Sequence, residues 1–183
     1  MKVILTGATG MVGQGVLREC LRDPGVERVL LLGRSPSGVS DPKVEEIVHK
    51  DLYDLAPIAD RLAGWEACFF CLGVSSAGMS EAEYRRVTYD LTLALAKVLA
   101  DKSPGCVFVY VSGKSTDSTA KGSTMWARVK GETENALLSM PFKGAYMFRP
   151  GFIEPLAGER PRSRVYSALY TVMRPLFPVL RNL

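Results

Sequence analysis

The chain has 183 residues, of which 47% are hydrophobic and 23% are charged, as is typical of one globular domain with a continuous core. Its formal net charge of +4 is spread along the chain, so we expect no nucleic-acid binding. No apolar run reaches the roughly 18 residues of a transmembrane segment, so we expect none.

Short apolar runs alternate with longer amphipathic stretches, and this pattern predicts an α/β fold with a parallel sheet. The predicted strands are 3–6, 28–32, 44–49, 67–72, 106–111 and 145–148. The predicted helices are 11–21, 55–62, 80–100 and 123–138, with a capping box at Ser80 and Glu83. Right-handed crossovers between six strands favour a doubly wound (Rossmann) sheet of order 3-2-1-4-5-6, with helices on both faces.

Two regions follow from this pattern. Residues 1–151 are expected to form a dinucleotide-binding Rossmann domain, and residues 152–183 a short cap packed on the same domain. An apolar face in the second region favours a homodimer or a buried lid, and it consists of Val165, Leu169, Val172, Met173 and Leu176.

A glycine-rich loop, Thr6-Gly7-Ala8-Thr9-Gly10-Met11-Val12-Gly13, directly follows the first strand and opens the first helix. Glycines three residues apart permit a tight turn and let phosphate oxygens approach backbone N–H groups at the positive end of a helix. The loop therefore predicts a nicotinamide-dinucleotide site, a glycine turn without a ligand being the alternative. The expected contacts are Thr6, Gly7, Thr9, Gly10, Met11, Val12 and Gly13.

The second strand ends at Gly33-Arg34-Ser35, where an NAD-binding domain would carry an acidic residue. A guanidinium at this point matches a 2′-phosphate, which favours NADP(H) over NAD(H); a solvated surface arginine is the alternative. Asp51 follows the third strand and is a candidate for binding the adenine amino group, or for capping a helix.

Other residues that often carry chemistry receive no such role. Cys68 and Cys71 have CxxC spacing inside an apolar run, so we interpret them as core residues, and we predict no metal site. His49, the only histidine, has no partner at a sequence distance that suggests a catalytic or metal site. The chain opens directly into Lys2-Val3-Ile4-Leu5 without a leader, from which we expect a cytoplasmic protein.

Several motifs together resemble the atypical, extended-like short-chain dehydrogenase/reductase family over about residues 1–155: TGATGMVG, Asp51-Leu52, Cys71-Leu72-Gly73, Ser112, Lys130 and Arg149-Pro150-Gly151. Cys71-Leu72-Gly73, the helix around 84–99 and Lys130-Gly131-Glu132 look like the small branch typified by the Tat-interacting oxidoreductase-like proteins. The resemblance implies further contacts to the cofactor from Asp51, Leu52, Cys71, Leu72, Gly73, Lys130 and Pro150.

The resemblance also implies catalytic roles. Ser112 corresponds to the serine that orients a substrate carbonyl, and Lys130 to the lysine that holds the nicotinamide ribose and lowers the pKa of a catalytic tyrosine. That tyrosine belongs four residues before the lysine, where this chain has Trp126. An indole N–H cannot supply the proton, so Trp126 is expected to stack near the nicotinamide, to line the wall of the pocket, or to pack its helix on the sheet. Thr88 also stands where the family commonly has asparagine.

These features predict a short-chain dehydrogenase/reductase-like oxidoreductase that binds NADP(H) and acts on a small carbonyl substrate with weakened or altered catalysis. The first alternative is a catalytically silent binding module that senses NADPH and signals to a protein partner whether NADPH is bound. The second is a sugar-nucleotide epimerase or dehydratase, suggested by Arg149-Pro150-Gly151, although only about 32 residues follow that segment.

Overall fold

Six parallel strands form the centre of the computed structural model, which describes residues 1–151 and 153. Their order is β3-β2-β1-β4-β5-β6, so the prediction of a doubly wound sheet is confirmed. The strands are β1 (Lys2–Thr6), β2 (Arg28–Gly33), β3 (Val44–Val48), β4 (Ala67–Phe70), β5 (Val107–Val111) and β6 (Gly144–Phe148). The direction of winding reverses between β1 and β4, and this is the point at which such sheets bind ligands.

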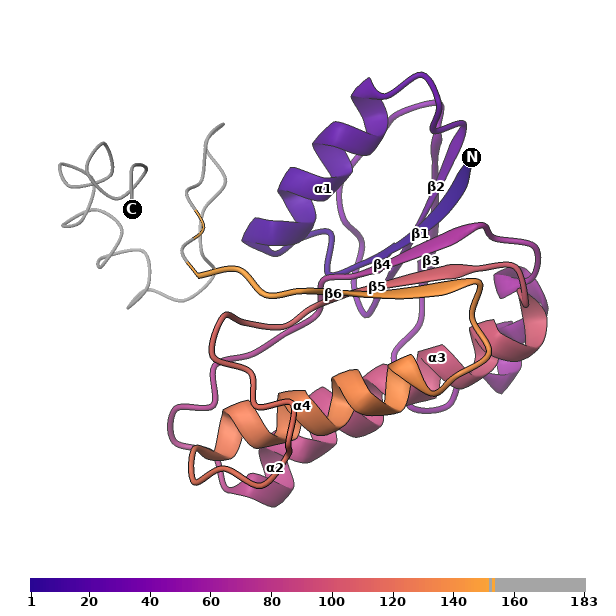
Figure 1. Cartoon of the computed structure of the whole chain (residues 1–183). Coiled ribbons are helices and arrows are strands. Elements are labelled where there is room, and N and C mark those ends of the chain that lie inside the picture. The colour runs from indigo at the N-terminus through magenta and orange to yellow at the C-terminus, as the bar shows by residue number, and fades with distance from the viewer. Residues whose placement is uncertain (152, 154–183) are drawn as a thin grey trace, which may run out of the picture.

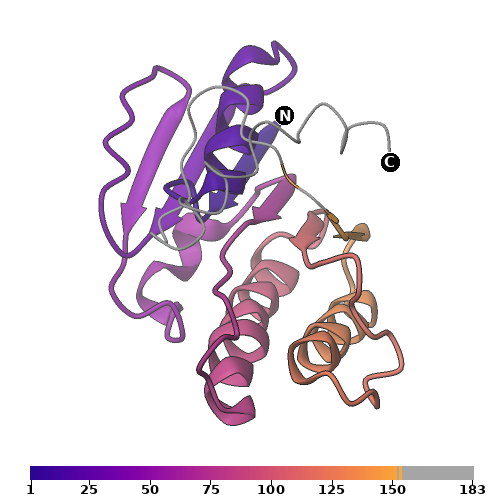
Figure 2. The same cartoon turned by 90° about the vertical axis from the view of Figure 1, so that its left-hand side faces the viewer.

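Helices cover both faces of the sheet, as predicted (Figure 1). One face carries α1 (Met11–Arg22), and the other carries α3 (Leu91–Lys102) and α4 (Met125–Leu138). Figure 2 shows α3 and α4 side by side beneath the sheet. The connection from β3 to β4 contains a 3₁₀ helix, η1 (Ala56–Leu62).

Alternate side chains of the inner strands enter two separate cores, because successive residues of a strand point to opposite faces. Val3 and Leu5 of β1 pack with Leu17 of α1 in one core. Ile4, between them, packs with Leu99 of α3 in the other core. Both faces of β1 are therefore buried, which explains its uninterrupted apolar sequence.

The predicted helix 80–100 is interrupted. It consists of α2 (Glu81–Arg85), a π-helical segment η2 (Arg86–Asp90) and α3. The capping box is confirmed, since the Ser80 hydroxyl accepts from the Glu83 amide and the Glu83 carboxylate accepts from the Ser80 amide. Thr88 is buried inside η2, and the Thr92 hydroxyl donates to the Thr88 carbonyl at 2.5 Å.

Two ion pairs fasten α2 to α4. Arg128 donates to both carboxylate oxygens of Glu81, with the shorter contact at 2.7 Å. One helical turn further along each helix, Arg85 pairs with Glu132. The orientation of α2 therefore decides whether its charged residues meet their partners on α4.

The predicted bounds of the other elements differ from the observed ones by one to two residues, in either direction. The segment η1 is a tighter helix than the α-helix expected for 55–62. The Ile58 amide donates to the Leu55 carbonyl three residues earlier, which is the hydrogen-bond spacing of a 3₁₀ helix. The predicted cap, 152–183, with its apolar face, lies outside the described residues except for Ile153. Within the described part of the chain, no helix is long and apolar enough to cross a membrane.

Candidate dinucleotide and catalytic site

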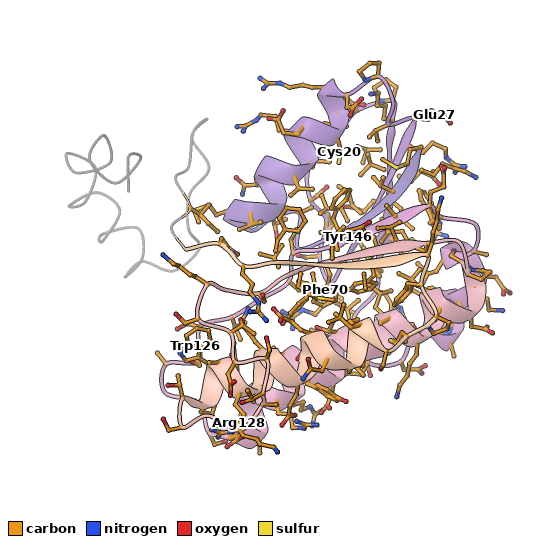
Figure 3. The ribbon with its side chains drawn as sticks, in the orientation of Figure 1. Cys20, Glu27, Phe70, Trp126, Arg128 and Tyr146 are labelled. Carbon is orange, nitrogen blue, oxygen red and sulfur yellow. The ribbon has the colours of Figure 1, made fainter. Side chains whose placement is uncertain are left out.

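The fold brings the predicted site residues to one edge of the sheet, where all six strands end (Figure 1). Thr6 is the last residue of β1, and Arg34 directly follows β2. Shortly after the next strands come Asp51, Leu52, Cys71, Leu72, Gly73, Ser112 and Pro150. Trp126 reaches the same edge from the first turn of α4 (Figure 3). Lys130 follows one turn later, and its ammonium contacts the backbone of Ser112.

The glycine loop packs directly on the backbone that follows β4. Gly7 has a φ of +72°, a left-handed conformation that favours glycine. A Cβ atom added to Gly7 would lie 2.7 Å from the Cys71 carbonyl group, and one added to Gly13 would lie 2.0 Å from the Gly7 carbonyl oxygen. Close approach of backbone therefore requires glycine at both positions, and it places Cys71 and Leu72 beside the loop.

The amino end of α1 is open to an anion. Gly10 is the N-cap, no side chain caps the helix, and its first turn contains no acidic residue. The Gly10 amide donates to the Gly7 carbonyl at 2.8 Å, which closes the turn in front of the helix. Free N–H groups at a helix start attract negative charge. In the described part of the chain, the buried Thr6 hydroxyl also lacks a hydrogen-bond partner. These features fit a diphosphate group.

Two cations lie together where β2 and β3 end. Arg34 is exposed, and among the described residues its guanidinium makes no ion pair. Its carbonyl accepts a hydrogen bond from Lys50 Nζ at 3.2 Å. Sequence reasoning missed Lys50, although its position at the end of the third predicted strand was a usable signal. Asp51 accepts from the Tyr53 amide at 2.9 Å, so its carboxylate stabilises the turn after β3.

An apolar cavity lies beneath this edge, between the sheet and α3. Its lining comprises Thr6, Leu32, Leu52, Leu55, Phe70, Leu72, Leu91 and Leu95. Cys71, next to this lining, is half-buried, and burial raises the pKa of its thiol to about 12. A thiol with this pKa is not a thiolate at neutral pH, which argues against a redox role for the CxxC pair. No group of metal-binding side chains occurs among the residues the structure describes.

Lys130 lies under the end of β5. Its ammonium donates to the Ser112 carbonyl at 3.1 Å and lies 5.6 Å from the centre of the Tyr110 ring. Burial lowers the pKa of Lys130 to about 8, and the nearby charge of Glu134 opposes this shift. The structure therefore brings Lys130 to Ser112, as the sequence motifs predict.

Trp126 lies one helical turn before Lys130, at the amino end of α4 (Figure 3). Its ring lies 3.6 Å from the position that a Cβ atom would occupy on Gly113, and the side chain is half-buried. The ring thus packs against the backbone directly after Ser112. This geometry places the indole beside the candidate catalytic residues and does not give it an acidic proton.

Glu134 is a further site residue that sequence reasoning missed. Its side chain is 2% exposed and lies on α4 one turn after Lys130. The Ser112 hydroxyl donates to Glu134 Oε1 at 2.5 Å, and Arg149 Nε donates to the same oxygen at 3.1 Å. Arg149 also donates to Ser118 Oγ at 2.6 Å. The four-residue spacing from Lys130 was the available signal.

The segments after β5 and β6 continue to pair beyond the strands. The Ser112 amide donates to the Phe148 carbonyl at 2.8 Å, and the Lys114 amide donates to the Pro150 carbonyl at 3.0 Å. These backbone bonds hold Arg149 next to Ser112, so the serine, the arginine and Glu134 come from three elements and meet at one point.

Comparison with known proteins identifies related chains. A family described as NAD dependent epimerase/dehydratase matches residues 3–135. Protein fmp52, mitochondrial, of Emericella nidulans is 31% identical over 174 residues, which cover 91% of this chain and 72% of that protein. Protein FMP52, mitochondrial, of Eremothecium gossypii is 33% identical over 163 residues, with coverage of 87% and 68%.

A solved structure, MoeE5 in complex with UDP-glucuronic acid and NAD, has a TM-score of 0.63 and 23% identity. The match covers 81% of this chain and 54% of that protein, so the chain spans about half the length of this structural neighbour. The likeness supports the Rossmann-type fold. The relatives' names correct one expectation: they are described as mitochondrial, so the cytoplasmic location inferred from the absence of a leader is wrong.

Proposed function

The chain belongs to the NAD dependent epimerase/dehydratase family, and from that premise we propose that it is an oxidoreductase that binds NADP(H) and acts on a small carbonyl substrate. The observation that carries this proposal is the uncapped amino end of α1, tight against the Gly7 backbone. Bound there, the dinucleotide supplies the hydride for carbonyl reduction or receives it in the reverse reaction.

Different residues around the loop bind different parts of the dinucleotide. Backbone N–H groups from Met11 to Gly13 face the diphosphate, and the Thr6 hydroxyl is available to it. Leu52 and Leu72 provide apolar contact at the adenosine end. Lys130 holds the nicotinamide ribose, a role that the family resemblance implies and that its position under Ser112 supports.

The preference for a 2′-phosphate depends on charge. Arg34 is exposed, its guanidinium makes no ion pair with any residue the structure describes, and Lys50 lies against its carbonyl. A planar guanidinium can bind phosphate through two parallel hydrogen bonds. The ammonium of Lys50 adds a second positive charge that attracts the phosphate. An NAD-specific domain has a carboxylate at the end of β2 that binds the ribose hydroxyls, and this chain has none there.

Catalysis is expected to be weak because Trp126 occupies the position of the proton donor. This same observation favours a second candidate function, a silent module that senses NADPH and signals to a protein partner. A sugar-nucleotide epimerase or dehydratase is compatible with the family and has no observation of its own in favour. Placement in the Tat-interacting oxidoreductase-like branch stays a prediction, as does a homodimer.

Calorimetric titration of the wild-type chain with NADPH and with NADH tests the cofactor proposal. We expect binding of both, with NADPH the tighter ligand. Turnover is then measured against aldehydes, ketones and quinones. Binding with turnover supports an oxidoreductase, and binding without turnover supports the sensor. If neither nucleotide binds at millimolar concentration, the proposed function is wrong.

A further inference from the structure

The proton of the Ser112 hydroxyl is directed at a buried carboxylate. Ser112 Oγ lies 2.5 Å from Glu134 Oε1, and its contact to the Phe148 carbonyl is longer, at 3.3 Å. Among the described residues, the donors of hydrogen bonds to the Glu134 carboxylate are this hydroxyl and the Arg149 guanidinium. A carboxylate surrounded by donors is an acceptor, so Glu134 is ionised in this arrangement.

Positively charged side chains lie beside the Glu134 carboxylate. Arg149 reaches it from the end of β6 and makes contacts to both carboxylate oxygens. Lys130 lies one turn earlier on α4, and Tyr110 faces it from β5. Besides the Ser112 hydroxyl, the groups described around Glu134 are thus two cations and a neutral phenol.

This arrangement changes what Ser112 offers to a substrate. Because its proton is held by Glu134, the half-buried hydroxyl presents a lone pair at the edge of the sheet. A carbonyl oxygen needs a donor and gains nothing from a lone pair. A substrate hydroxyl is a donor, and it matches this oxygen. The ground state of the site is therefore complementary to an alcohol.

We propose that Ser112 and Glu134 form a proton relay that takes the place of the missing tyrosine, an inference that rests on the proposed function. In alcohol oxidation, the substrate O–H bond breaks and its proton passes to Ser112 Oγ, while the proton already on Ser112 passes to Glu134 Oε1. The C–H bond breaks at the same time, its electron pair leaves as hydride to the oxidised nicotinamide, and the C–O bond becomes C=O.

The relay balances without another reactant. Alcohol, oxidised dinucleotide and the Glu134 carboxylate become carbonyl compound, reduced dinucleotide and the Glu134 carboxylic acid. Carbonyl reduction runs the same steps backwards and begins with the acid form. Ser112 touches the substrate, whereas Glu134 acts through it and is a positioning residue that also stores the proton. Trp126 closes the place from which a tyrosine would otherwise reach the substrate oxygen.

Two substitutions and a matched control test the relay. Ser112→Ala removes the hydroxyl and leaves the ion pair of Glu134 with Arg149 intact, whereas Glu134→Gln keeps the shape and removes the charge. Glu132→Gln is the control, because Glu132 lies on the same helix and pairs with Arg85 away from the relay. Each variant is first compared with wild type by thermal unfolding and by NADPH titration.

Steady-state rates with NADP⁺ and a panel of small primary and secondary alcohols give the first readout. We expect Ser112→Ala and Glu134→Gln to lower kcat by about 10² or more. KM should change less than about threefold in Glu134→Gln and should rise further in Ser112→Ala, which also loses the hydrogen bond to the substrate hydroxyl. The double variant should be no slower than the slower single variant, because the two residues act as a unit. Glu132→Gln should keep the wild-type rate.

Proton NMR of the chain without nucleotide gives a second readout. A hydroxyl proton held by a carboxylate exchanges slowly with water and resonates downfield, so we expect one coupled to the Ser112 Hβ protons in wild type and in Glu132→Gln. It should be missing in Glu134→Gln.

The outcomes separate the two proposals. Failure of wild type to bind either nucleotide overturns the proposed function itself. Binding and turnover with Ser112→Ala and Glu134→Gln as active as the control overturn the relay alone. A wild-type spectrum without the Ser112 hydroxyl proton, together with unchanged rates on Glu134→Gln, would assign Glu134 to the ion pair with Arg149 only.

Discussion

Two glycines of α1 should respond to the same substitution with opposite signs. An alanine Cβ at Gly13 would lie 2.0 Å from the Gly7 carbonyl oxygen and 2.6 Å from the Gly7 carbonyl carbon. Carbon and oxygen normally approach to about 3.5 Å, so the loop must retreat by about 1.5 Å. At Gly15, a Cβ atom meets none of the described atoms within 4 Å.

The expected magnitudes follow from these distances. Overpacking of this kind lowers the free energy of unfolding by about 1–3 kcal/mol, so Gly13→Ala should lower Tm by roughly 2–12 °C. Gly15→Ala restricts the unfolded chain without a clash and should raise the free energy of unfolding by about 0.5–1 kcal/mol, or Tm by about 1–4 °C.

Thermal unfolding and NADPH titration of both variants provide the assay. Because the Gly7 carbonyl must move away from α1, Gly13→Ala should also weaken NADPH binding by about tenfold or more, which corresponds to about 1.4 kcal/mol. Gly15→Ala should bind as wild type does. Full stability together with unchanged affinity in Gly13→Ala would refute both the packing of the loop and its role in binding.

Three further predictions concern the site. Arg34→Glu should weaken NADPH binding by about tenfold or more and spare NADH in calorimetry, with Arg61→Glu as a charge-matched control; equal losses for both nucleotides would make Arg34 structural. Trp126→Tyr places a phenol one turn from Lys130 and should raise reductase activity on some small carbonyl compound by about tenfold or more; no gain with unchanged NADPH affinity would favour the sensor. Lys130 has a folded pKa of about 8 against an ordinary value of 10.5, so the unfolded chain binds more protons between these values and this lysine destabilises the fold below pH 8. The stability of Lys130→Met relative to wild type, measured by urea unfolding, should therefore fall by about 2–3 kcal/mol from pH 7 to pH 10.5, and a constant difference would contradict the burial of the ammonium.

The strand order and the meeting of the site residues could be predicted because both depend on local patterns. Apolar runs mark the strands, and in a parallel sheet the residues after each strand must come to the same edge. The helix start at Ser80 could also be predicted, because its capping box consists of two residues that are three positions apart. Lys130 and Trp126 follow from their four-residue spacing on one helix.

The Glu134 cluster could not be predicted with the same means. Its three members come from the residue after β5, from α4 and from the residue after β6. Only the packing of these elements brings Ser112, Glu134 and Arg149 together. A glutamate near the end of an amphipathic helix normally faces water, so the four-residue spacing from Lys130 places Glu134 on the same helix face and does not show that it is buried. The π-helical segment escaped prediction for a related reason, because the apolar stripe of 80–100 continues through it.

That segment, η2, sets the rotational phase between α2 and α3. Its wider turn adds a residue relative to a regular helix, and one residue of α-helix corresponds to a rotation of about 100°. Deleting one residue from 86–90 would therefore allow a continuous helix while turning α2 away from α4. Glu81 and Arg85 would lose Arg128 and Glu132, and buried Tyr84 would turn towards water, although the amino-acid composition would hardly change. In a related chain, a one-residue gap at this place should thus coincide with loss of the complementary charges on α4.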